Sequence, residues 1–176
     1  MKKTEMKKEQ TKKQSSEKKI VLIGADHAGF DLKNKLVAYL RTEGHTVEDI
    51  GADKLVADDD YPAILAPVGM RIATDPEKYI GIVIGGSGTG EAIVCNRFPG
   101  VRAAVYYGGG YNDERSWSSL DIVKLSREHN DANVLSLGAR FVTEEEAMAA
   151  SRLFLSTSFS GEDRHSRRIA EIDEIE

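Results

Sequence analysis

The sequence has very little cysteine and no long hydrophobic run. Its one cysteine, Cys95, excludes an internal disulfide and a cysteine-rich zinc site. No apolar stretch approaches the roughly 18 residues that span a membrane, and the N-terminus lacks the apolar core of a secretory signal. These absences predict a cytoplasmic protein without a membrane partner.

A basic surface is also missing from most of the chain. The formal net charge of the 176 residues is -5, although the first 19 residues hold eight lysines and three glutamates. The remainder is therefore strongly acidic, which argues against nucleic acid as a partner because phosphate backbones require a basic face. We interpret residues 1–18 as a disordered lysine-rich tail and residues 19–176 as one domain.

Strand and helix patterns alternate after this tail. The expected strands are Ile20–Gly24, Thr46–Ile50, Ile80–Ile84, Val101–Tyr106 and Asn133–Leu137. The expected helices are Phe30–Thr42, Tyr61–Ala73, Ala92–Arg97, Leu120–Arg127, Thr143–Leu155 and Arg164–Ile175. This order predicts an α/β fold with a five-stranded parallel sheet and helices on both faces, whose ligands bind beyond the carboxyl ends of the strands.

Two local signals refine the helices. Pro67, inside the second predicted helix, indicates a kink or a later start. Thr143 and Glu146 have the spacing of a capping box at the start of a helix.

The most informative segment follows the third predicted strand. Four glycines fall within six residues, directly before Glu91: Gly85, Gly86, Gly88 and Gly90. Glycines at a strand-to-helix turn let bare backbone approach a ligand, and the unpaired N–H groups of a helix start attract anions. A glutamate on this rim can move a proton while N–H groups hold an enediolate oxygen. The segment therefore indicates chemistry on a phosphorylated or enolisable small molecule.

The same glycines leave other interpretations open. A dinucleotide fingerprint needs a glycine where Glu91 stands, and a phosphate-binding P-loop needs a lysine that is absent here. Glu91 could also only favour the first helical turn by its charge. A non-catalytic nucleotide-binding sensor is the alternative from another functional class, and it leaves Glu91 and the histidine and arginine motifs below unexplained.

Further candidates flank other predicted strands. Asp26 and His27 directly follow the first strand, at the ligand edge, although Asp26 could merely cap the next helix. His129 ends the predicted helix before the fifth strand, where it could complement the helix dipole or act as an acid and base on a sugar ring oxygen. His45 lies at the opposite end of the sheet, so we interpret it as structural.

A basic segment opens the last predicted helix. Arg164 and Arg168 are four residues apart and share a helix face, which suits a phosphate, and Arg140 could join them. The alternative is a solvated basic turn.

Two features are interpreted as structural. The acidic run Asp58–Asp60 could suggest a metal, but three adjacent acids cannot all converge on one ion and no histidine partners them, so we expect a solvated loop. Cys95 follows Glu91 by one helical turn, and a buried hydrophobic role is favoured. No metal site is expected.

In their order along the chain, these motifs resemble the ribose-5-phosphate isomerase B family, which includes galactose-6-phosphate isomerase subunits. The matching motifs are Gly24–Gly29, Asp60–Pro62, Gly85–Glu91 with Asn96, Arg127–Asn130 and Arg164–Arg168. The resemblance implies a Rossmann-like three-layer αβα sandwich and a homodimer, or a higher oligomer, with sites built across the interface. It also implies aldose–ketose isomerisation through a cis-enediolate, without metal or cofactor.

The resemblance further implies residue roles. Glu91 matches the base of one branch, and Gly85 stands where another branch places a cysteine base. Asp26 and His129 look like the ring-opening pair, and Ser87 and Gly90 look like the anion hole. The remaining implied substrate contacts are His27, Arg140, Arg164 and Arg168 at the phosphate, Asn130 at the sugar, and Tyr61, Gly86, Gly88 and His165.

The expected substrates are D-ribose 5-phosphate and D-ribulose 5-phosphate. The loop Tyr107–Ser119 is longer than is usual in the family and could alter the pocket rim or the dimer contact. An isomerase of a six-carbon sugar phosphate, such as allose 6-phosphate or galactose 6-phosphate, is therefore the alternative.

Overall fold

A computed structural model describes residues 18–109 and 118–175. Residues 1–17 of the lysine-rich tail and residues 110–117 of the long loop lie outside the described residues. The strands form one parallel sheet in the order β2-β1-β3-β5-β4. They are β1 (Ile20–Ala25), β2 (Val47–Asp49), β3 (Tyr79–Gly85), β4 (Ala103–Tyr106) and β5 (Val134–Gly138). The predicted five-stranded parallel sheet is confirmed.

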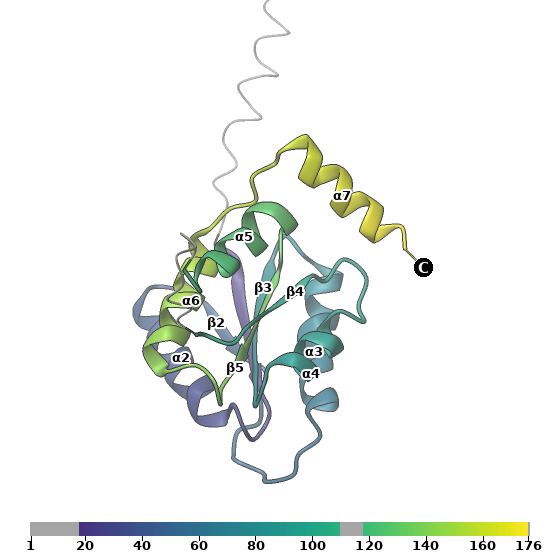
Figure 1. Ribbon diagram of the computed structural model, residues 1–176. Coiled ribbons are helices and arrows are strands. Elements are labelled where there is room, and N and C mark those ends of the chain that lie inside the picture. Colours follow the sequence, from purple (N-terminus) through teal and green to yellow (C-terminus); the bar gives the residue numbers. More distant parts are fainter. Residues whose placement is uncertain (1–17, 110–117, 176) are drawn as a thin grey trace, which may run out of the picture.

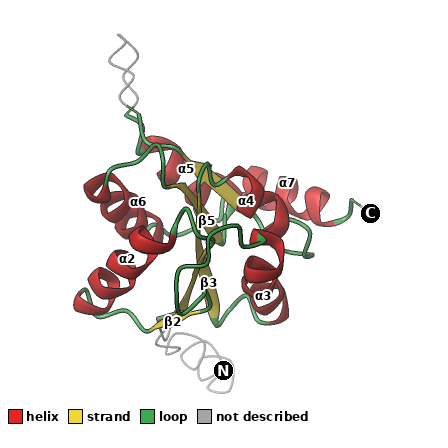
Figure 2. Ribbon diagram, turned by 90° about the horizontal axis from the view of Figure 1, so that it is seen from below, coloured by secondary structure: helices red, strands yellow, loops and turns green. Residues whose placement is uncertain are grey.

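Helices cover both faces of this sheet (Figure 2). One face carries α2 (Phe30–Thr42), α5 (Asp121–Asn130) and α6 (Glu144–Ser156), and the other carries α3 (Tyr61–Thr74) and α4 (Thr89–Cys95). The last helix, α7 (Asp163–Asp173), packs against α5. The architecture is thus the predicted three-layer sandwich. No helix in the described part of the chain has the length and apolar character to cross a membrane.

The central strand β3 is buried on both faces, as a parallel strand between two helical layers must be. Ile82 and Ile84 pack into the core beneath α2 and α6, whereas Val83 packs into the core beneath α3 and α4. Burial of each such side chain contributes about 1.5–3 kcal/mol. The missing side chain of Gly81 lets α3 pack close to β3. A Cβ atom at this position would lie only 2.7 Å from the Ile72 side chain on α3.

The helix after the glycine turn begins earlier than its sequence pattern indicates. We predicted a start at Ala92, but α4 starts at Thr89 and therefore includes Glu91 in its first turn. The preceding Gly88 has φ +76, a left-handed conformation that disfavours residues with a side chain. This glycine reverses the chain directly after β3, so the helix can begin within the glycine-rich segment.

One further helix start agrees with the prediction, and one further helix end differs from it. The helix α3 starts at Tyr61 and continues through Pro67, so the predicted alternative of a later start is wrong. The helix α5 runs to Asn130 and therefore contains His129. The residue after it, Asp131, adopts a left-handed conformation that ends the helix.

The predicted capping box at the start of α6 is present. The Thr143 hydroxyl accepts a hydrogen bond from the Glu146 N–H at 3.2 Å, and the Glu146 carboxylate accepts one from the Thr143 N–H at 2.8 Å. We expect Thr143→Ala to lower the free energy of unfolding by about 1 kcal/mol, because it leaves an N–H at the helix start unpaired. Urea unfolding measures this change. Thr46→Ala, at an exposed threonine outside any helix, is the control, and an equal loss there would contradict the assignment.

Candidate active site

Glu91 lies at the carboxyl end of β3, in the first turn of α4. Its side chain is only 4% exposed, and its carboxyl group fills the space beside Gly85, where an added Cβ atom would overlap the carboxyl oxygens. Burial raises the pKa of the Glu91 carboxyl, and the nearby charge of Asp26 raises it further. A carboxyl held in this way is suited to accept a proton from a substrate and to return it.

Two side chains enclose the glycine turn around Glu91. The Arg140 guanidinium lies against Gly86, where an added Cβ atom would come within 3.1 Å of the Arg140 Cζ. The Arg140 backbone N–H also donates to the Gly86 carbonyl at 3.1 Å, which holds the main chain of Arg140 beside the turn. Tyr61 packs on Gly90 in the same way, 2.8 Å from an added Cβ. The structure thus gathers these predicted substrate contacts at one edge of the sheet: Tyr61, Gly86, Ser87, Gly88, Gly90 and Arg140.

Asp26 and His27 lie at this same edge, directly after β1. Asp26 is buried, and its Oδ1 accepts hydrogen bonds from the N–H groups of Ala28 at 3.0 Å and Gly29 at 3.1 Å. The carboxylate therefore does shape the turn before α2, as the capping alternative proposed. It also lies close enough to Glu91 and His27 to raise the pKa of each. Asp26 thus has a structural role and a place in the site.

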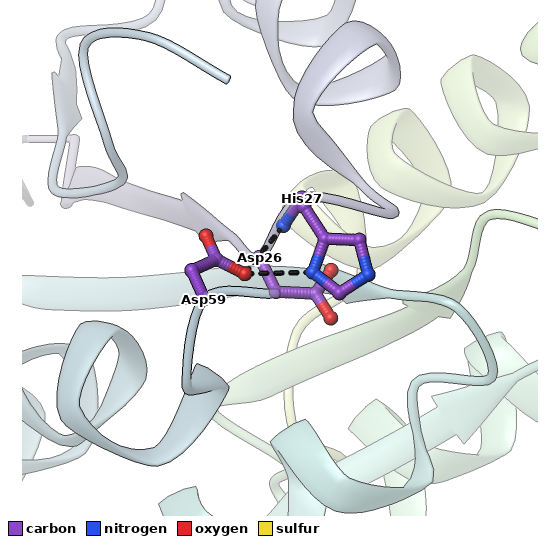
Figure 3. A group of neighbouring side chains, drawn as sticks. All are labelled: Asp26, His27 and Asp59. Atoms are coloured by element: carbon purple, nitrogen blue, oxygen red, sulfur yellow. Dashed lines mark hydrogen bonds and ion pairs between the residues drawn. The ribbon is translucent and has the colours of Figure 1, made fainter. Parts of the chain in front are cut away.

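Asp59 is a residue of this site that the sequence interpretation missed. The prediction of a solvated loop is wrong for Asp59. Its side chain is only 10% exposed and contacts His27 (Figure 3). The acidic run does have a histidine partner, His27, contrary to the prediction. Asp59 and His27 are 32 residues apart, so no local pattern indicates the contact. The sequence offers a weak signal, because His27 follows β1 and Asp59 lies in the loop between β2 and α3, and both strands end at the ligand edge.

The potential metal-ligand atoms of Asp26, His27 and Asp59 lie within 4.8 Å of one another. Hydrogen bonds already account for this grouping, because Asp59 accepts from His27 and Asp26 accepts from the backbone of the following turn. The absence of a metal site in the active enzyme stays a prediction.

His129 lies at the opposite end of the sheet from Glu91. His129 is near the end of α5, and the chain then enters the first residue of β5. Glu91 lies beside Gly85, which pairs with Gly138, the last residue of β5. The length of β5 alone separates these edges by about 13 Å. In Figure 1 the two ends are marked by α7 at the top and by the loop between β2 and α3 at the bottom. A single chain therefore does not bring Asp26 and His129 together.

A second group of predicted residues gathers around His129. Its ring lies against the ring of His165, with centroids 4.3 Å apart and planes 38° apart. His165 is 3% exposed, and its Nδ1 is hydrogen-bonded to the Ser160 hydroxyl at 2.9 Å. Burial and the neighbouring His129 lower the pKa of His165. The full group comprises His129, Asn130, Arg164, His165 and Arg168, of which both arginines are exposed on α7.

Cys95 faces the core instead of the site. It is fully buried beneath α3, and burial, together with the negative charge of Glu91, raises the pKa of its thiol to about 12. A thiol of this kind stays protonated and unreactive. The interpretation of Cys95 as a buried hydrophobic residue is confirmed.

The raised pKa of Glu91 predicts how the fold responds to pH. The folded chain holds this proton more tightly than the unfolded chain, so ionisation of Glu91 costs stability as the pH rises above the ordinary value of 4.5. Glu91→Gln removes this cost. We expect the variant to have a higher free energy of unfolding than the wild type near pH 7, and no such advantage below about pH 4. Urea unfolding at both pH values measures the difference, and a constant difference would contradict the assignment.

Comparisons with known proteins identify the family of the chain. Ribose-5-phosphate isomerase B of Mycolicibacterium paratuberculosis is 42% identical over 156 residues, which cover 89% of this chain and 91% of that protein. The Escherichia coli protein of the same name is 36% identical over 90% of this chain and 97% of its own. A crystal structure of ribose-5-phosphate isomerase B from Mycoplasma genitalium with bound ribulose-5-phosphate matches with a TM-score of 0.78 and 34% identity, over 88% of this chain and 93% of that chain. A family model described as ribose/galactose isomerase matches residues 21–172, and the chain belongs to this family.

Proposed function

We propose that the protein interconverts D-ribose 5-phosphate and D-ribulose 5-phosphate through a cis-enediolate. The observation that carries this proposal is the buried carboxyl of Glu91, packed on Gly85 beside a glycine turn. The names of the relatives and the ribulose-5-phosphate in the Mycoplasma genitalium structure support the choice of substrate.

In the proposed reaction, Glu91 moves one proton between two neighbouring carbons. Its carboxylate removes the C2 proton of open-chain ribose 5-phosphate, and the electron pair moves to the C1 oxygen to form the enediolate. N–H groups of the Ser87–Gly90 turn stabilise this negative oxygen. The O2 proton then passes to O1, and the acid form of Glu91 returns its proton to C1, which leaves a ketone at C2.

Two further groups prepare the substrate. Asp26 and His129 open the furanose ring by moving a proton between the ring oxygen and the C1 hydroxyl. His27 and Arg140 bind the phosphate from the Glu91 edge, and the exposed Arg164 and Arg168 bind it from the His129 edge. Asn130 contacts the sugar beside His129.

We infer that a second copy of the chain completes each site. In one chain the proposed base and the proposed ring-opening histidine belong to opposite ends of the sheet, so neither group can serve the other in the same molecule. A two-fold dimer solves this problem, because each contact in its interface occurs twice. The His129 group of one copy then meets the Glu91 group of the other, and one interface builds two equivalent sites.

The role of Glu91 has a direct kinetic test. Glu91→Gln keeps the shape of the side chain but cannot accept a proton, so we expect kcat to fall by about 10²-fold or more while KM changes little. A coupled assay on ribose 5-phosphate measures both constants. Solvent deuterium incorporation into the sugar should fall in parallel, because the same proton transfer causes it.

Glu77→Gln, at an exposed glutamate, controls for the loss of one negative charge. Near-normal turnover in Glu91→Gln would refute the proposed base. The same assay on allose 6-phosphate and galactose 6-phosphate tests the substrate, since a higher kcat/KM on either sugar would displace ribose 5-phosphate.

Subunit mixing tests the shared site. Glu91→Gln and His129→Asn should each be nearly inactive alone. A mixed dimer combines the intact Glu91 of one copy with the intact His129 of the other, so random mixing should restore about a quarter of the wild-type activity. If both residues served a site within one chain, mixing would restore nothing. Unmixed variants that have been dissociated and reassembled in the same way are the control.

A further inference from the structure

One carboxylate oxygen of Asp59 holds both the main chain and the side chain of His27. Asp59 Oδ1 accepts a hydrogen bond from the His27 backbone N–H at 3.0 Å and lies 2.7 Å from the His27 Nδ1 (Figure 3). The other ring nitrogen points away from Asp59 in this view. Because an ionised carboxylate can only accept, Nδ1 must carry the proton that it shares with Asp59. The orientation of the ring is therefore fixed by a single neighbour.

This arrangement decides what His27 can offer to an anion. In a neutral ring whose proton is on Nδ1, the second nitrogen, Nε2, carries a lone pair. In a phosphate dianion every terminal oxygen is also only an acceptor, so this lone pair and the anion would repel each other. In the protonated ring Nε2 carries a hydrogen and the ring has a positive charge. Only the protonated ring of His27 can therefore donate a hydrogen bond to a phosphate dianion.

Three charged groups face the His27 ring from three elements. Asp59 precedes α3, Asp26 follows β1, and Arg140 follows β5. The hydrogen bond from Asp59 is the largest influence and raises the pKa of His27, as does the charge of Asp26, whereas burial and Arg140 lower it. The side chain of His27 is 35% exposed, so the ring remains open to a ligand while Asp59 is largely covered.

We propose that Asp59 is a positioning residue for phosphate recognition, which aims the Nε2 of His27 at the anion and keeps the ring protonated. This inference rests on the proposed function, in which His27 contacts the substrate phosphate. Asp59 itself does not touch the substrate. Its Oδ1 is held by the backbone N–H and the Nδ1 of His27. A carboxylate in direct contact with a phosphate would also repel it, because both groups are negative.

Asp59→Asn separates orientation from charge. The amide oxygen of asparagine can still accept from both N–H groups of His27, but the negative charge that favours the protonated ring is gone. Asp59→Ala removes both. We therefore expect Asp59→Asn to keep the ring in place and to let it lose its proton at a lower pH.

The matched control is Asp58→Asn. Asp58 is the exposed neighbour in the same acidic run, and its φ of +67 is a left-handed conformation that asparagine adopts readily. The control thus makes the same change in charge one residue away without touching His27.

The first measurement follows the His27 ring by NMR. Its C–H resonances, assigned with His27→Gln, are titrated from about pH 5 to about pH 9, with EDTA present to exclude bound cations. In the wild type and in Asp58→Asn the midpoint should lie above 6.5, and in Asp59→Asn it should move down toward that value. A wild-type midpoint at or below 6.5 would overturn the proposal without the need for any variant.

The second measurement is anion binding, with sulfate as the probe because it stays doubly charged over this range. Between the two midpoints the ring is charged in the wild type and neutral in Asp59→Asn, so sulfate should bind about fivefold more weakly to the variant. Near pH 6 both rings are mostly protonated and the difference should shrink. An equal loss at every pH would indicate a merely structural role and would overturn the proposal.

Kinetics provide the third measurement. The KM for ribose 5-phosphate should rise in Asp59→Asn over the same pH interval, with kcat unchanged because Glu91 is untouched. If the protein does not isomerise ribose 5-phosphate but the NMR and sulfate results hold, the proposed function fails and the role of Asp59 stands. If isomerisation is normal but Asp59→Asn does not change the affinity for sulfate, only the inference about Asp59 fails.

Discussion

The contact between the Glu91 carboxyl and the bare backbone of Gly85 is the constraint on which the site depends. Any side chain at position 85 would occupy the volume that the carboxyl fills. The buried residues of β3 fix Gly85, and the left-handed Gly88 starts α4 close enough to turn Glu91 back onto the strand end. A cysteine at position 85 would compete with Glu91 for the same space.

The proposed division of the site between two copies follows from the topology of a parallel sheet. Each helix returns the chain from the carboxyl edge to the amino edge, so a residue at the end of a helix lies at the opposite edge from a residue at the end of a strand. Glu91 and His27 belong to strand ends, whereas His129 belongs to the end of α5. Assembly is therefore part of the proposed chemistry. A change in the interface would then alter catalysis without touching the residues of either half.

Much of the fold could be predicted from sequence because its signals are local: apolar runs for the strands, and Thr143 with Glu146 for the start of α6. The Glu91 half of the site was also predictable, since its residues follow strands that end at one edge. His45 follows the end of α2 and His129 lies near the end of α5, each shortly before the next strand, so both belong to the edge opposite the strand ends. This topology could have separated the two halves of the site from the sequence alone. The contact of Asp59 with His27 could not be predicted, because it joins distant loops and depends on side-chain orientation.

In the proposed mechanism, the raised pKa values of Glu91 and His27 set opposite limits on the pH range of activity. Glu91 must lose its proton before it can act as a base, and burial moves that step to higher pH. His27 must keep its proton to bind a phosphate, and Asp59 moves that loss to higher pH as well. In the proposed mechanism the active form therefore exists between the pKa of Glu91 and the pKa of His27. Without Asp59 the pKa of His27 would fall toward the pKa of Glu91. Burial of Glu91 narrows the pH range of activity from below, and Asp59 widens it again from above.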